Sequence, residues 1–190
     1  SGRRVAEVLE ETPALANPEQ PRTAVADGSI DFDHVHFSYK QGSGGEALRD
    51  IDIHIRPGET IGVIGGTGSG KSTLANLICR LYDVDAGSVR VGGVDVRAYD
   101  MEALRTQVAV VPQNNVLFSG TVLENLRWGR EDATGAECRE ACRLACADDF
   151  VSRLPQGYES RIERGGSNLS GGQRQRLCIA RALLKRPKIL

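Results

Sequence analysis

The sequence predicts an α/β fold in which a glycine-rich loop joins a strand to a helix. The loop is the run Gly65-Gly66-Thr67-Gly68-Ser69-Gly70-Lys71-Ser72, which fits the phosphate-loop pattern G-x-x-x-x-G-K-[ST]. Residues 60–64, just before it, are apolar and rich in β-branched side chains, which is typical of a buried strand. After the loop, apolar residues recur at the spacing of one helix face: Leu74, Leu77, Ile78 and Leu81. This order aims a helix N-terminus at an anion.

The composition of the loop has a mechanical explanation. Small residues let backbone N–H groups point inward at a phosphate without a clash from Cβ atoms. The ammonium of Lys71 then reaches the outer phosphates, and the hydroxyl of Ser72 can bind Mg²⁺. We therefore predict a nucleotide site. A plain flexible glycine turn, the alternative, explains neither Lys71-Ser72 nor the flanking periodicity.

Composition and charge exclude other classes. The chain has 190 residues, which is about one ordinary domain, and 40% of them are hydrophobic. Its 24 basic and 25 acidic residues nearly cancel, which argues against a general nucleic-acid binder. No apolar run is long enough for a transmembrane helix. The five cysteines suit no disulfide framework, which favours a reducing cytosol.

Three of the cysteines, Cys138, Cys142 and Cys146, lie four residues apart, so a helix would place them on one face. We expect them to pack as small apolar residues. A metal site on this face is the alternative.

The segment before the loop predicts an attachment followed by strands. Residues 3–9 resemble the end of a helix, and the prolines that follow predict an extended linker. Residues 30–37 predict a strand whose apolar phase slips, which indicates a bulge. Residues 41–45 predict a flexible turn, and residues 51–55 alternate as a half-buried strand does.

The segment after the first helix predicts further strands and then helices. Residues 88–93 indicate a strand and turn, and Asp100 can cap a short helix that runs through Gln107. Residues 108–111 predict a buried strand that ends at Pro112-Gln113. The pattern is then mostly helical to about Leu154, with Thr134 and Glu137 as a capping box.

The last part of the chain predicts one more helix and the beginning of a strand. Leu177, Ala180, Leu183 and Leu184 mark the apolar face of the helix, which Pro187 stops. Lys188-Ile189-Leu190 reads as the start of another strand.

A second motif resembles the signature sequence of ATP-binding cassette (ABC) proteins. It is Leu169-Ser170-Gly171-Gly172-Gln173, downstream of the phosphate loop. Between the two motifs, Gln113 ends a Val-Pro-Gln triplet and matches the Q-loop glutamine of the family. Tyr39 matches the aromatic residue of the family's A-loop. With four motifs in this order, the chain resembles the nucleotide-binding domain of an ABC protein.

Two further segments resemble exporters. Residues 3–9 are similar to the segment that joins the last membrane helix of an exporter to its nucleotide-binding domain. Residues 116–126 are similar to exporter subunits of the multidrug and lipid type. The resemblance implies a P-loop NTPase fold with a RecA-like core, an antiparallel β subdomain and an inserted α-helical subdomain.

The resemblance also implies a division of the chain. Residues 1–27 would be the tail of a membrane-domain helix and a linker, and residues 28–190 the nucleotide-binding domain. Within it, residues 28–112 would be the β subdomain and loop core, residues 113–176 the mainly helical subdomain, and residues 177–190 the return to the core.

The resemblance implies roles for single residues. Tyr39 would stack on adenine, Lys71 would neutralise phosphate charge, and Gln113 would position water or Mg²⁺ together with Ser72. The implied nucleotide-binding set is Tyr39, Gly65, Gly66, Thr67, Gly68, Ser69, Gly70, Lys71, Ser72, Thr73 and Gln113. Ser170, Gly171, Gly172 and Gln173 would act in trans, on ATP bound to a second nucleotide-binding domain.

The implied function is an ATP-hydrolysing motor for export at the cytoplasmic face of the cell membrane. Two nucleotide-binding domains would pack head to tail around two ATP molecules, as a homodimer or a heterodimer. Coupling helices of a transmembrane domain would contact the helical subdomain; residues 161–165, of which Glu163-Arg164-Gly165 match the exporter X-loop, would touch them. The alternatives are a soluble non-transport ABC ATPase and a degenerate ATP-binding subunit of a heterodimeric exporter.

The family pattern continues with an apolar strand that ends in Asp and Glu, the Walker B motif. Ile189-Leu190 is the only trace of that strand here. No residue can therefore be assigned as the general base. We expect the chain to be a fragment in which the later strands of the sheet are missing, and which binds nucleotide with negligible hydrolysis.

Overall fold

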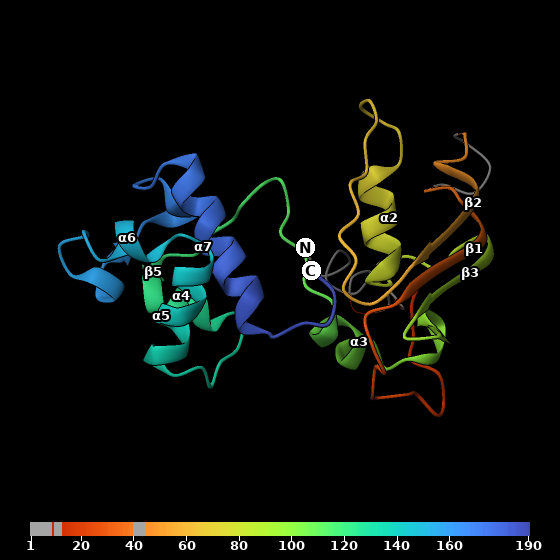
Figure 1. The fold of residues 1–190 in the computed structure, drawn as a ribbon, viewed down its shortest axis with the longest axis horizontal. Helices are drawn as coiled ribbons and strands as arrows, with labels where there is room; N and C mark the ends of the chain where they lie inside the picture. Colours follow the sequence, from red (N-terminus) through yellow and green to blue (C-terminus); the bar gives the residue numbers. More distant parts are fainter. Residues whose placement is uncertain (1–8, 10–12, 40–44) are drawn as a thin grey trace. The chain divides into compact units, whose positions relative to one another are not determined.

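The computed structural model describes residue 9, residues 13–39 and residues 45–190 (Figure 1). Contacts divide the chain into two compact units, one that ends at Leu104 and one from Arg105 to Leu190. The helix predicted at residues 3–9 and the turn predicted at residues 41–45 lie, apart from one residue each, outside the described residues. In the described part of the chain, no helix combines the length and the apolar character that a membrane crossing needs.

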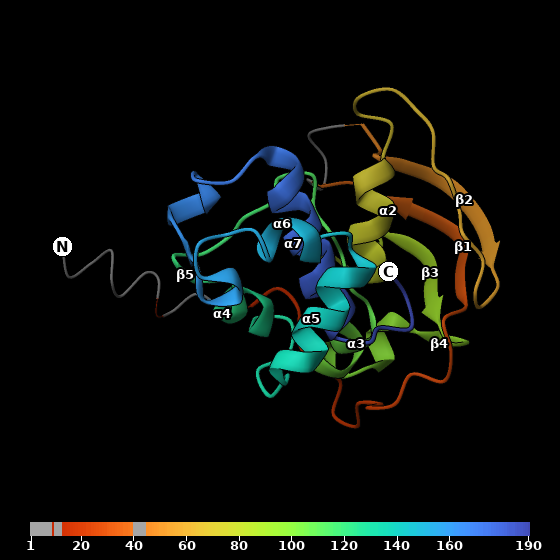
Figure 2. The ribbon, with the colours of Figure 1, turned by 60° about the vertical axis from the view of Figure 1, so that its left-hand side comes forward.

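The first unit contains a four-stranded antiparallel sheet with the strand order β2-β1-β3-β4. Its strands are β1 (Ile30–Phe37), β2 (Leu48–Ile55), β3 (Ala86–Val91) and β4 (Val94–Asp95). Helix α2 (Lys71–Ile78) lies beside this sheet (Figures 1 and 2) and contacts β3. The strands predicted at residues 30–37, 51–55 and 88–93 are therefore confirmed, and they form an antiparallel sheet.

Strand β1 contains the predicted bulge. Its register with β2 shifts between Phe32 and Val35, and His34 between them has a φ of 45°. The extra residue lets Phe32 and Val35 both remain buried although their spacing breaks the alternation of a regular strand. The phase slip in the sequence was a true signal of this geometry.

The proline-containing segment before β1 is tied to the first unit at three places. The Arg80 Nη2 atom donates to the carbonyl oxygen of Ala16 at 3.0 Å. The backbone N–H of Met101 donates to Asn17 Oδ1 at 3.0 Å, and Arg22 forms a parallel bridge with Tyr99. These contacts hold residues 16–22 against the rest of the first unit.

The strand predicted at residues 60–64 is not formed. These residues have no strand assignment, and Ile61, Val63 and Ile64 are exposed, Ile64 by 99%. A buried parallel strand exists only where neighbouring strands take up its backbone hydrogen bonds. Among the described residues, no strand pairs with this run. The run has the apolar composition of a buried strand, but composition alone does not supply a hydrogen-bonding partner.

Helix α2 is shorter than its apolar spacing predicts. It ends at Ile78, and Arg80 follows in a left-handed conformation with a φ of 48°. The N–H of Leu81 bonds to the carbonyl of Asn76, and that of Arg80 to the carbonyl of Leu77. This pair of bonds is a Schellman ending, which closes the helix before Leu81 can join its buried face.

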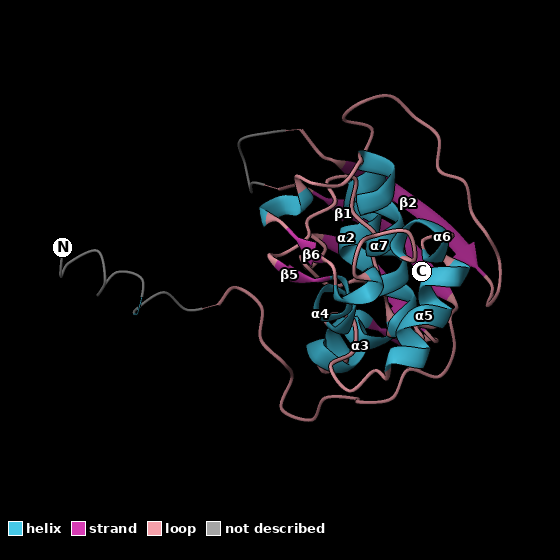
Figure 3. Ribbon diagram, turned by 90° about the vertical axis from the view of Figure 1, so that its left-hand side faces the viewer, coloured by secondary structure: helices cyan, strands magenta, loops and turns pink. Residues whose placement is uncertain are grey.

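The second unit is mainly helical, as predicted. Its helices are α4 (Val122–Arg127), α5 (Gly135–Leu144), α6 (Asp148–Val151) and α7 (Gly171–Leu184), and the short strands β5 (Gly120–Thr121) and β6 (Arg161–Ile162) pair side by side (Figure 3). The predicted capping box is confirmed, since Glu137 N donates to Thr134 Oγ1 at 3.2 Å and Thr134 N donates to Glu137 Oε2 at 2.9 Å. The hydrogen bond from Arg130 and those from Thr134 lower the pKa of Glu137 to about 2.

The short helix predicted after Asp100 is also confirmed, as α3 (Met101–Gln107). The backbone N–H of Ala103 donates to the Asp100 carboxylate at 2.9 Å. Asp100 thus satisfies a backbone donor of the first turn, as an N-cap residue does.

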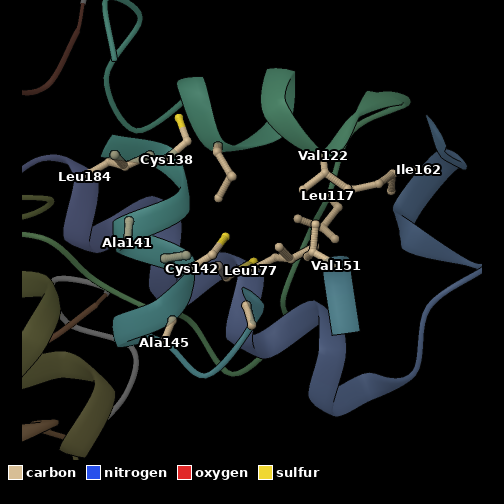
Figure 4. Close-up of a cluster of buried hydrophobic side chains, with 14 of the residues drawn as sticks. Leu117, Val122, Cys138, Ala141, Cys142, Ala145, Val151, Ile162, Leu177 and Leu184 are labelled. Carbon is tan, nitrogen blue, oxygen red and sulfur yellow. The ribbon is translucent and has the colours of Figure 1, made fainter. Parts of the chain in front are cut away.

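Helices α4, α5 and α7 enclose one apolar cluster (Figure 4). Cys138 and Cys142 are buried in it, as expected for small apolar residues, and burial raises the pKa of the Cys142 thiol to about 12. The expectation was wrong for Cys146, which is exposed and has a φ of 53°. Because α5 ends at Leu144, Cys146 lies beyond the helix and does not share its face.

The strand predicted at residues 108–111 is reduced to one parallel bridge. Val108 pairs with Ile189, and the N–H of Ala109 donates to the Ile189 carbonyl at 2.9 Å. Val110 is exposed. The strand start predicted at residues 188–190 therefore forms only as this single bridge.

Candidate nucleotide-binding site

The phosphate loop closes around its own lysine. The Nζ atom of Lys71 donates to the carbonyl oxygens of Gly65 and Gly66, each at 2.7 Å, and to Ser69 Oγ at 3.2 Å. Lys71 is also the first residue of α2. A positive charge therefore lies at the start of a helix, where free backbone N–H groups already favour an anion.

Glycine is required where the loop enters α2. Gly70 has a φ of 87°, which L-residues rarely adopt. A Cβ atom there would lie 2.7 Å from Leu48 Cδ2 and 2.8 Å from the carbonyl oxygen of Ala47. Gly68 has a φ of 83° for the same turn. The backbone conformation therefore favours glycine at both positions, and at Gly70 the nearby start of β2 also leaves no room for a side chain.

Tyr39 lies beside this loop, two residues after the end of β1. Its hydroxyl is 2.9 Å from the hydroxyl of Thr73, a buried residue in the first turn of α2. The Tyr39 side chain is 50% exposed, so its ring borders solvent. A tyrosine that only filled the core would not combine this exposure with a bond to the phosphate-loop helix.

Tyr39 and the loop line one pocket of about 390 Å³, to which Glu46 and Ala47 also contribute. This volume is within the range of small-molecule sites. The pocket combines an aromatic ring, loop backbone and an ammonium group, which suit a base and a chain of phosphates. The exposed hydroxyl of Ser72 is the kind of oxygen ligand that Mg²⁺ accepts.

The second unit holds the other predicted residues. Ser170 is the N-cap of α7: its Oγ accepts from the N–H of Gln173 at 3.3 Å, and its own N–H donates to Gln173 Oε1 at 2.8 Å. Ser170, Gly171 and Gly172 are exposed, and a Cβ atom on Gly172 would meet nothing within 4 Å. The start of α7 is thus an ordered helix N-terminus that faces solvent.

Gln113 is exposed and lines a pocket of about 640 Å³ together with Gly171, Arg174 and Gln175. Arg174 was not predicted as a site residue. Its Nη1 atom donates to the carbonyl oxygens of Leu169 at 2.8 Å and Gly166 at 3.2 Å. It therefore joins the turn at residues 164–166 to the signature helix. Its place directly after the signature motif was the only sequence signal.

Sequence reasoning also missed an exposed aromatic pair. Phe118 and Trp128 stack with ring centroids 4.4 Å apart and an angle of 22°, and Trp128 is 66% exposed. The buried Asn125 holds the Phe118 loop, because its side chain bonds to the N–H and the carbonyl of Phe118 at 2.8 and 2.9 Å. The available signal was the single tryptophan of the chain, set in the polar run Arg127-Trp128-Gly129-Arg130.

The first unit therefore brings Tyr39 to the phosphate loop, and the second brings Gln113 to the signature helix. A model of the family described as ABC transporter matches residues 48–190, which contain the phosphate loop, Gln113 and the signature motif. The chain belongs to the ABC transporter family. The predicted family and the α/β P-loop fold class are thereby confirmed.

The relatives of this ABC chain include proteins named for multidrug efflux and for fatty acid transport. It is 44% identical to a multidrug efflux ATP-binding/permease protein of Mycobacterium bovis, over 98% of this chain and 16% of the relative. It is 39% identical to a fatty acid ABC transporter ATP-binding/permease protein of the same species, over 100% of this chain and 30% of the relative. The chain thus spans at most about a third of the length of these proteins.

A solved structure is similar as well. A bacterial Atm1-family ABC exporter with ATP bound superposes with a TM-score of 0.91 at 35% identity, over 98% of this chain and 32% of the exporter chain. The ABC assignment from sequence motifs and the resemblance of the fold agree.

Proposed function

We propose that this ABC chain is the ATP-binding and ATP-hydrolysing motor domain of an exporter. The observation that carries the proposal is one pocket in the first unit, which Tyr39, the phosphate loop and Lys71 line together. The names of the relatives, multidrug efflux and fatty acid transport, favour export over a soluble ABC ATPase. ATP hydrolysis would drive the movement of a substrate across a membrane.

In this proposal the first unit binds ATP. The ring of Tyr39 stacks on adenine, a kind of contact that contributes affinity and that any nucleobase can make. Backbone N–H groups of residues 65–73 hold the phosphates, and Lys71 neutralises charge on the β- and γ-phosphates. Ser72 and Gln113 would hold Mg²⁺, which when bound neutralises further phosphate charge, and Gln113 would also orient water.

The second unit would act on ATP bound to another copy or to a paralogue. Ser170, Gly171, Gly172 and Gln173 begin α7, and their exposed N-terminus favours the γ-phosphate. Two nucleotide-binding domains would pack head to tail about a two-fold axis, so that each ATP lies between a phosphate loop and a signature helix.

We also propose a division of the chain into two parts and a location for it in the cell. Residues 1–27 would be the tail of a membrane-domain helix and its linker, and residues 28–190 the nucleotide-binding domain at the cytoplasmic face of the cell membrane. No residue within 1–190 is assigned as the general base. We therefore expect a polypeptide of residues 1–190 alone to bind ATP without measurable turnover.

The exposed pair Phe118 and Trp128 would be the contact for a coupling helix of the transmembrane domain. The pair borders a pocket of about 240 Å³ that Val116 and Arg181 also line. The Arg181 side chain donates to the Val116 carbonyl at 3.1 Å, and Asn125 holds the Phe118 loop, so the surface is ordered. Two stacked rings on an ordered surface are suited to anchoring an apolar helix face.

Replacing Trp128 by alanine is expected to uncouple ATP use from export in the full-length protein. A buried aromatic anchor contributes about 2 kcal/mol or more at an interface, so the contact should weaken by roughly thirtyfold. ATP-driven uptake of a fluorescent multidrug probe into inverted membrane vesicles would measure the loss. ATP binding should be retained, because Trp128 does not line the ATP pocket.

Two matched variants control this experiment. Trp128→Phe keeps a ring that can stack on Phe118 and should retain most of the transport. Leu144→Ala removes another exposed apolar side chain outside the pocket and should change nothing. Full probe uptake by Trp128→Ala would contradict the coupling role of this surface.

A further inference from the structure

We propose that Tyr82 is a positioning residue for the nucleobase: it holds the ring of Tyr39 edge-on and so orients that ring before ATP binds. The inference rests on the proposed function, in which Tyr39 stacks on adenine. It assigns to Tyr82 a role in the affinity for the base and none in the affinity for the phosphates.

Three aromatic rings of the first unit form one cluster. The ring centroids of Tyr39 and Tyr82 are 5.2 Å apart, and the ring planes are at 90°. Phe37 packs on both, with its centroid 5.0 Å from that of Tyr39 and 5.5 Å from that of Tyr82. The edge-to-face arrangement is the favoured geometry of aromatic pairs. The edge contacts from Phe37 and Tyr82 therefore limit rotation of the Tyr39 ring.

The far end of Tyr39 is fixed as well. Its hydroxyl is hydrogen-bonded to the hydroxyl of Thr73, which is buried in α2. Because α2 begins at Lys71, this bond ties the ring to the helix that follows the phosphate loop. Ring contacts set the plane of Tyr39, and the hydroxyl bond sets its distance from the loop.

The turn that carries Tyr82 is itself held in place. It follows the Schellman ending of α2, in which Arg80 has a φ of 48°. The buried Arg80 side chain pairs with Asp83, with 3.0 Å between Nε and Oδ1, and bonds to Ala16. Tyr82 lies between Arg80 and Asp83 in the sequence, so the contacts of these two residues hold the backbone on both sides of it.

An ordered ring has a measurable consequence for affinity. A half-exposed tyrosine that moved freely would lose rotamer freedom when it stacked on a base. The cost of ordering one such side chain corresponds to roughly a three- to tenfold change in affinity. In the proposed function the ring of Tyr39 meets the base and the loop holds the phosphates, so only ligands with a base should be affected.

The test compares ATP with inorganic tripolyphosphate, both with Mg²⁺, by titration calorimetry on the purified full-length protein. Tyr82→Leu should weaken ATP binding by roughly three- to tenfold and leave the tripolyphosphate affinity unchanged. Tyr82→Phe keeps the ring edge and should bind both ligands as the unchanged protein does. Equal weakening of both ligands, unchanged ATP affinity in Tyr82→Leu, or the same loss in Tyr82→Phe would overturn the positioning role.

A second variant separates this inference from the proposed function. Tyr39→Ala should weaken ATP binding more than Tyr82→Leu does, again without an effect on tripolyphosphate. If Tyr39→Ala weakens ATP binding and Tyr82→Leu does not, the positioning role of Tyr82 is overturned alone. If Tyr39→Ala leaves ATP affinity unchanged, the base site of the proposed function is wrong, and the inference falls with it.

Discussion

Replacing Lys71 by alanine in the full-length protein is expected to weaken ATP binding by roughly tenfold to a hundredfold and to abolish hydrolysis. The Lys71 ammonium lies within hydrogen-bond distance of the loop carbonyls of Gly65 and Gly66. It is therefore placed to meet phosphate oxygens at the N-terminus of α2. Hydrogen bonds to charged groups contribute about 1.5–3 kcal/mol each, which corresponds to this change in affinity. Titration with a fluorescent ATP analogue measures it directly.

The matched control is Lys185→Ala, which removes a lysine from the second unit. Lys185 does not line the pocket of Tyr39 and the loop, so ATP affinity should stay unchanged. Thermal unfolding of both variants checks that the fold is retained. Wild-type affinity in Lys71→Ala would remove this loop from the ATP site.

Replacing Gly172 by glutamate in the full-length protein is expected to abolish ATP-dependent association of nucleotide-binding domains and to reduce hydrolysis by more than a hundredfold. A Cβ atom at Gly172 would meet nothing within 4 Å, so the helix has room for the side chain. An acidic residue in the first turn of a helix is favourable for folding. Its charge would, however, repel the γ-phosphate that a second copy presents, because like charges in close contact are strongly unfavourable.

This variant distinguishes the association of nucleotide-binding domains from the binding of ATP to each domain. Each Gly172→Glu chain keeps its own phosphate loop, so ATP affinity measured on the dissociated protein should be unchanged. Gly135→Glu is the matched control, since Gly135 begins α5 and a Cβ atom there approaches only the end of the Arg139 side chain, at 3.8 Å. ATP hydrolysis at the wild-type rate by Gly172→Glu would show that the signature helix does not contact nucleotide.

The parts of the fold that could be predicted from sequence are those that local interactions decide. The capping box at Thr134 and the cap at Asp100 each need only a residue three positions away, and both are present. The bulge in β1 follows from the slip in its own apolar pattern. The turn at Gly70 follows from a backbone conformation that glycine alone adopts easily.

The parts that could not be predicted depend on distant partners. Residues 60–64 have the composition of a buried strand but no described neighbour to pair with. Leu81 fits the helical spacing, yet a left-handed Arg80 ends α2 before it. Periodicity shows which face a segment could bury, whereas hydrogen-bond partners decide whether the segment forms and where it stops.

The candidate site shows the same limit. The residues of the phosphate loop and signature motif are consecutive, so a short motif reveals them. The stack of Phe118 on Trp128 joins a loop to the end of α4, and Tyr82 meets Tyr39 from the turn after α2. Such pairs have no fixed spacing in sequence, and only the folded chain brings them together.

The most direct test of the account asks whether one ATP is held between two copies. One population of the full-length protein carries Thr67→Cys in the phosphate loop, and a second, differently tagged population carries Gly172→Cys. Both also carry Cys146→Ser, because Cys146 is the exposed cysteine among the five described. The populations are produced together and treated with a short bis-maleimide.

The account predicts a crosslink between the two tags that forms with ATP in the absence of Mg²⁺, where hydrolysis is prevented, and not without nucleotide. A crosslink yield between the tags that is the same with and without ATP would contradict the head-to-tail arrangement of phosphate loop and signature helix.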